Sequence, residues 1–127
     1  ELAAGSKIDL LSVYRQLRDR VLSESSAGRM YARLYYRVAP EIMAQALGSK
    51  ELRADMLDVL ESFSPAAASL AAGTGADVSL AQLAKLSVLI NALRQNASPL
   101  LKRVLDMLER DIDSGVFESA FQISIQR

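Results

Sequence analysis

Arginine and tyrosine side chains are concentrated in one stretch of the sequence, and they are its best candidates for binding chemistry. Between Arg15 and Arg37 there are six arginines against two acidic residues, so this stretch is about four charges positive. Arg29, Arg33 and Arg37 are spaced four apart and share one face of a helix, with Tyr36 close to them. Guanidinium groups beside an aromatic ring can hold phosphates and stack on bases. One prediction is therefore a face for an acidic partner, whether nucleic acid, anionic lipid or acidic protein.

The same pattern also fits an ordinary solvated face of an amphipathic helix. Tyr31 and Tyr35 would then be core residues, and the acidic stretch from Asp106 to Glu118 would supply partners for the arginines. Charged stripes of this kind are common on amphipathic helices, so this is the interpretation that the sequence favours, and nucleic acid is not the expected partner.

Little in the sequence supports catalysis or metal binding. Cysteine and histidine are both absent, which removes thiolate chemistry, Ser-His nucleophiles and the commonest metal ligands. The run from Asp111 to Gly115 is similar to the start of a calcium loop, but Gly115 stands where the fifth-position ligand belongs. Asp55 and Asp58 share a helix face without any sign of a pocket. The sequence predicts no enzyme, no cofactor and no metal site.

The elements that must position these residues are predicted to be helices. Half of the 127 residues are hydrophobic and the formal net charge is zero, as expected for one folded domain over residues 1–127. The stretch Val78–Leu93 is apolar at nearly every helical angle, and a helix of this kind is buried among others. We predict an all-α fold, a compact bundle of about six or seven helices around a central apolar helix over about 79–96. Its expected core residues are Leu86, Leu89, Ile90 and Leu93.

Capping residues, prolines and glycines set the predicted helix boundaries. The first expected helix is 7–22, after a Ser6–Asp9 capping box, and the second runs from the serine-rich break 23–28 to Val38. Three further helices are expected at 40–48, after Ser49, and at 65–72. The central helix follows a Ser79–Gln82 capping box, and the last helix runs from Ser98-Pro99 to Gly115. Pro40 and Pro65 are each expected to interrupt a helix. Residues 73–77 are predicted to be a linker.

The tail 116–127 changes its period. Phe121, Ile123 and Ile125 alternate with polar residues, which predicts a half-buried strand. A single strand could pack as an extended arm, pair with another chain, or lead into a neighbouring domain.

The run Leu17–Pro40 resembles the CFI-box C-terminal domain, a helical module near the ends of multidomain prokaryotic proteins that are often exported. The resemblance rests on Arg18-Asp19, Gly28-Arg29 and Tyr35-Tyr36 followed by Pro40, and it covers roughly residues 1–63, with 64–115 as additional helices. The Cys-Phe-Ile tripeptide that names the family is missing. The resemblance implies a late module of a larger protein at the cell surface or outside the cell; it implies no activity.

Together these observations predict a non-enzymatic helical interaction or structural module. Its expected partners are other domains of a parent chain, a separate protein, or a second copy in a homo-oligomer. The alternative is binding of an acidic partner through Arg29, Arg33, Arg37 and Tyr36. No membrane span is expected, because Lys85 interrupts the best apolar run.

Overall fold

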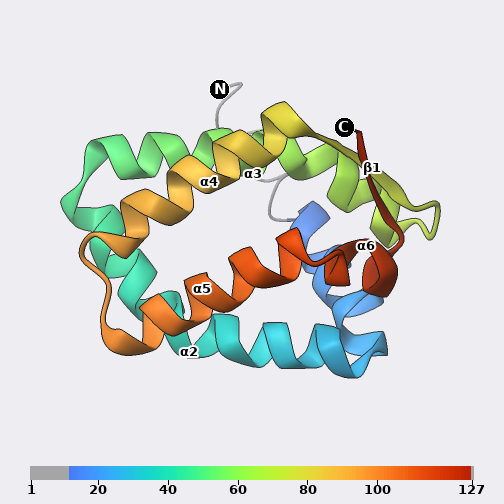
Figure 1. The fold of residues 1–127 in the computed structure, drawn as a ribbon, viewed down its shortest axis with the longest axis horizontal. Helices are drawn as coiled ribbons and strands as arrows, with labels where there is room; N and C mark the ends of the chain where they lie inside the picture. Colours follow the sequence, from blue (N-terminus) through green and yellow to red (C-terminus); the bar gives the residue numbers. More distant parts are fainter. Residues whose placement is uncertain (1–11, 127) are drawn as a thin grey trace.

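The helices of this protein pack as antiparallel neighbours in a computed structural model that describes residues 12–126. In Figure 1, α3 and α4 lie side by side along the upper edge and α2 and α5 along the lower edge, with α6 and the strands at one end. This arrangement confirms the predicted all-α bundle. The elements are a 3-10 turn η1 (Leu22–Glu24), α2 (Ser26–Gly48), α3 (Lys50–Ala71), β1 (Ala76–Ser79), α4 (Leu80–Arg94), α5 (Pro99–Asp113), α6 (Val116–Phe121) and β2 (Ile123–Gln126).

Four of the predicted helix starts, those of α2, α3, α4 and α5, are confirmed by their capping hydrogen bonds. The side chain of Ser49 accepts from the amide of the third residue after it, and Ser25 and Ser98 cap α2 and α5 in the same way. Ser79 and Gln82 form the complete capping box of α4, with both reciprocal bonds present. These starts were predictable because each cap depends only on residues within one turn.

The predicted interruptions at Pro40 and Pro65 are wrong, because α2 and α3 both continue through their prolines. A proline inside a helix costs about 3 kcal/mol, because one backbone hydrogen bond is lost and the ring crowds the carbonyl four residues earlier. At Pro65 the freed carbonyl belongs to Glu61, and the hydroxyl of Ser64 donates to it at 3.0 Å. At Pro40 the core residues Val38 and Ile42 lie on both sides of the ring, and α2 changes direction part-way along (Figure 1). Val38 is buried and Ile42 is half-buried, so their burial offsets part of the cost, since a fully buried side chain of this kind contributes about 1.5–3 kcal/mol.

The main core draws on all four long helices. Its buried members are Val38 of α2, Leu52 of α3, Ile90 and Leu93 of α4, and Leu101 and Leu105 of α5. Leu101 is the largest side chain that is completely buried. The centre of the fold is therefore shared, with α5 contributing its most enclosed residue.

The expectation of a central helix holds for only one side of α4. Ile90 and Leu93 are buried as predicted and Leu86 and Leu89 are half-buried, but Val88 is 59% exposed. Leu80, at the start of the helix, is 50% exposed. Three alanines and one serine separate the large side chains of α4, and small residues tolerate water well, so the sequence overstates how much of the helix is enclosed.

The tail forms the predicted strand, and its partner lies in the same chain. Strand β2 pairs in parallel with β1, with Ala76 opposite Ile123 and Val78 opposite Ile125. The predicted start at Phe121 is wrong, because that residue is buried at the end of α6. The predicted linker at 73–77 is also wrong in part: Gly73 and Gly75 make a turn at positive φ, and the chain then enters β1.

The first helix is partly described. Residues 12–20 are helical, whereas the predicted start at Lys7 and its Ser6–Asp9 capping box lie outside the described residues. The hydroxyl of Tyr14 donates to the carbonyl of Leu60 at 2.8 Å and ties this segment to α3. Burial raises the pKa of Tyr14 to about 12, so the phenol remains a donor at neutral pH.

A carboxylate joins the middle of α2 to the start of α5. Glu41, the residue after Pro40, accepts from the amide of Ser98 at 2.7 Å and also from its hydroxyl. The same hydroxyl oxygen accepts from the amide of Leu101. These hydrogen bonds lower the pKa of Glu41, because they favour its charged form.

We expect Leu101→Ala to lower the free energy of unfolding by about 2–5 kcal/mol, because it leaves a cavity in a fully enclosed site. Val88→Ala on the exposed side of α4 is the control and should cost less than about 1 kcal/mol. Urea unfolding followed by circular dichroism measures both changes. Similar losses of unfolding free energy in the two variants would contradict the placement of Leu101 in the core and of Val88 outside it.

We expect Glu41→Gln to lower the melting temperature at pH 7, and the difference from the wild type to shrink as the pH falls below about 4. A carboxyl group with a lowered pKa in the folded state stabilises the fold above its unfolded pKa and stops doing so once it is protonated. Melting curves of both proteins across this pH range test the prediction. A difference that stayed constant with pH would show that the charge of Glu41 is not involved.

Candidate partner-binding face

A close backbone contact fixes the beginning of α2. Gly28 is buried under η1, and a Cβ atom at this position would lie 2.3 Å from the carbonyl oxygen of Leu22. Its amide donates to the hydroxyl of Ser25 at 2.9 Å. The Gly28-Arg29 pair therefore has a structural explanation: the glycine admits the preceding turn, and the arginine begins the exposed side of the helix.

The structure brings all four sequence-predicted residues to the solvent-exposed side of α2. Arg29 donates through Nη1 to the carbonyl of Ser23 at 3.0 Å, and the hydroxyl of Tyr36 accepts from Arg18 at 3.1 Å. Arg33 and Arg37 have no recorded hydrogen bond or ion pair within residues 12–126. At least two guanidinium groups are thus available for a partner.

Three carboxylates of α5 have other partners than these arginines. Asp106 and Glu109 pair with Arg94 of α4, and Asp111 accepts from the hydroxyl of Tyr31. Contrary to the prediction, these three acids do not pair with Arg29, Arg33 or Arg37. Arg18 is a paired cation near the stripe: it lies 2.9 Å from Asp19 and lowers the pKa of that carboxyl.

Two residues of the exposed face were not predicted from the sequence. Met43 is 58% exposed and Leu47 is 77% exposed, and they continue the line of Tyr36 along α2. They were missed because Pro40 was expected to end the helix, and a separate helix would have had its own orientation. Tyr35 was also misplaced: it is 58% exposed and packs edge-on against Tyr36 at 5.9 Å.

The α2 face is defined here as the exposed residues that share this side of the helix: Arg29, Arg33, Tyr36, Arg37, Pro40, Met43 and Leu47. Its first half carries the cations and its second half is apolar. In Figure 1 the first part of α2 runs along the lower edge of the molecule and its last part turns upward towards α3.

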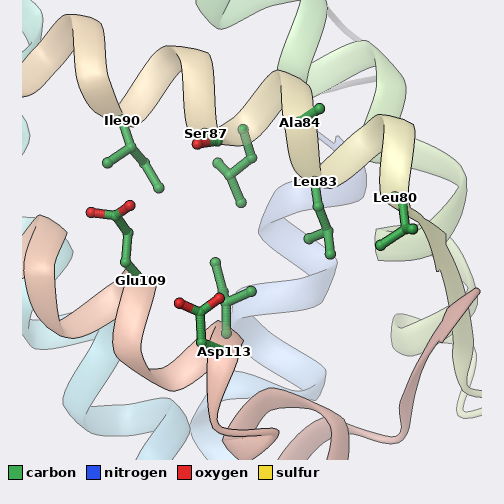
Figure 2. Close-up of a pocket in the computed structure, with 9 residues that line it drawn as sticks. Leu80, Leu83, Ala84, Ser87, Ile90, Glu109 and Asp113 are labelled. Atoms are coloured by element: carbon green, nitrogen blue, oxygen red, sulfur yellow. The ribbon is translucent and has the colours of Figure 1, made fainter. Parts of the chain in front are cut away.

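A groove between α4 and α5 is the second feature that could receive a partner. It has a volume of about 260 Å³, and Leu80, Leu83 and Ile90 of α4 line it opposite Glu109 and Asp113 of α5. Figure 2 shows the two carboxylates projecting from α5 towards α4 across this space. The α4 wall is largely apolar, and the α5 wall carries the two carboxylates beside Ile112.

The remaining candidates show no chemistry of their own. Asp58 pairs with Lys85 at 3.2 Å, and Asp55 lines a separate cleft of about 410 Å³ where α2 meets α3. Within the part of the chain that the structure describes, no cluster of three or more acidic side chains could hold a metal ion. None of the described helices is both long and apolar enough to cross a membrane.

Comparisons of the chain with protein-family models, curated proteins and solved structures find no match. The resemblance of Leu17–Pro40 to the CFI-box domain therefore stays a hypothesis, and the case for function depends on the geometry described above.

We expect Gly28→Ala to destabilise the fold by about 1–3 kcal/mol, because its methyl group would collide with the backbone of η1. Gly48→Ala is the matched control: it adds the same methyl group where nothing lies within 4 Å and the backbone is not left-handed. Chemical unfolding of both variants measures the contrast. Equal stabilities would mean that η1 does not lie against α2 in solution.

Proposed function

We propose that this chain is a non-enzymatic interaction module that binds an acidic, amphipathic helix of a protein partner through the α2 face. The observation that carries the proposal is that cations and large apolar side chains follow one another on the exposed side of α2, before and after its change of direction near Pro40. Both functions expected from the sequence, an interaction module and the binding of an acidic partner, are combined in this proposal.

The apolar half of the α2 face supports a protein partner. Tyr36, Met43 and Leu47 are each more than half exposed, and large apolar side chains grouped in this way on a surface commonly mark an interaction site. Arg33, Tyr36, Pro40, Met43 and Leu47 follow one another at steps of three and four residues. This is the spacing at which one helix meets another along a seam.

The charged half of the α2 face sets the expected chemistry of that partner. Arg33 and Arg37 are without a carboxylate partner among the described residues, and a guanidinium group can form paired hydrogen bonds to a carboxylate. A partner helix with glutamates beside its apolar stripe would satisfy both halves. A nucleic acid would engage the arginines but would leave Met43 and Leu47 in water, which is why a protein is favoured.

The proposal is tested with a synthetic amphipathic peptide that carries leucines at heptad positions flanked by glutamates. The wild type should bind it, and Arg29→Gln/Arg33→Gln/Arg37→Gln should weaken binding roughly tenfold or more, as should Met43→Ser/Leu47→Ser. Lys102→Gln/Arg103→Gln/Arg110→Gln, on the exposed side of α5, is the charge-matched control and should bind like the wild type. Exposed ion pairs contribute only about 0–1 kcal/mol, so the arginine variants should remain folded.

A second titration with a short single-stranded oligonucleotide separates the alternatives. Tight binding that falls steeply with salt, is lost in the triple arginine variant and is unaffected by Met43→Ser/Leu47→Ser would assign the face to a polyanion instead. Equal peptide binding by the wild type and both α2 variants would contradict the proposal.

A further inference from the structure

The α4–α5 groove has the chemistry that would complement the α2 face. Its size is below the range of about 300–1,000 Å³ that is usual for small-molecule sites, yet it can accept one or two anchoring side chains of a protein partner. Leucine and isoleucine supply its apolar wall, and Leu80 at its edge is half exposed. The groove therefore suits an apolar anchor that is flanked by cations.

Carboxylates dominate the charge around this groove. Glu109 is in contact with Arg94, whereas Asp113 is exposed and has no recorded partner within residues 12–126. Asp106, on the same helix, shares Arg94 with Glu109, so one cation serves two acids. A net negative charge remains for a basic partner to neutralise.

We propose that copies of this chain associate head to tail, with the α2 face of one copy seated in the α4–α5 groove of the next. This inference rests on the proposed function and names a second copy as the partner of the α2 face. The arginines would approach Glu109 and Asp113, and Met43 and Leu47 would cover Leu80 and its apolar neighbours.

The charge distribution along the sequence favours such a contact. The chain has no net charge, and proteins near neutrality lack the mutual repulsion that keeps copies apart. Its charges are nevertheless segregated: residues 15–37, which include the first half of α2, are about four charges positive, while Asp106–Glu118 has five acidic residues against one arginine. Opposite patches on a neutral molecule attract one another most strongly at low salt.

The two surfaces are different, so the contact is heterologous. Each copy offers one α2 face and one groove, and repetition of the contact gives a ring if the rotation closes and an open chain if it does not. This geometry makes a prediction that a symmetric dimer does not make, since each surface can be disabled separately.

The test is sedimentation velocity of the full chain at increasing concentration in low and high salt. At low salt the mass of the wild type should rise above 13.8 kDa with concentration, and at high salt it should return towards that value. Arg29→Gln/Arg33→Gln/Arg37→Gln and a groove variant, Leu80→Lys/Asp113→Lys, should each be monomeric alone. Their equimolar mixture should form a one-to-one dimer that grows no further, because only one functional contact remains.

Two further variants keep the test decisive. Leu80→Ser/Asp113→Asn removes the groove's features without adding charge and should also prevent self-association, even if the lysine variant is unstable. Leu57→Lys/Glu61→Lys places the same two lysines on α3 and should associate like the wild type.

A wild type that stays monomeric at all concentrations would overturn the inference. If the α2 face still bound the acidic peptide, the proposed function would stand and its partner would be a different protein. Self-association that survived in either surface variant, or a mixture that failed to form the dimer, would also overturn the head-to-tail contact.

Discussion

The hydrogen bonds between Glu41 and Ser98 join the middle of α2 to the start of α5. Glu41 lies at the middle of α2, and Ser98 is the residue from which α5 begins. The same serine also caps α5, so the carboxylate of Glu41 contacts the residue at which that helix begins. Leu101 comes one turn later and is completely buried, so the most enclosed residue of the core lies next to the contact between α2 and α5.

Local features of the fold could be predicted from the sequence, whereas features decided by packing could not. Ser49, Ser98 and the Ser79–Gln82 box act within one turn, and each was placed correctly. Pro40 and Pro65 follow an equally local rule, but its cost is only about 3 kcal/mol and can be offset by burial that no local pattern reveals. The pairing of β1 with β2 joins segments that are far apart in the sequence, and nothing in either segment identifies the other.

The residues of the candidate site are likewise of two kinds, those that helical spacing predicts and those that depend on packing. Arg29, Arg33, Arg37 and Tyr36 were placed on one face from their spacing alone, because helical periodicity is enough to do so. Met43 and Leu47 could join them only after α2 was known to continue through Pro40. The α4–α5 groove was beyond prediction, since its walls come from two helices whose separation depends on the whole core.

The parallel pairing of β1 with β2 also constrains the order in which the chain can fold. Residues 76–79 have their partner at residues 123–126, so this ladder cannot form on the ribosome until the later segment has been made and released from the exit tunnel. Helices α2 and α3 are contiguous in sequence and can pair much earlier, because their contacts close short loops. The small apolar cluster of Ala66, Ala76 and Val78 therefore lacks the contribution of Ile123 until residues 123–126 have been made.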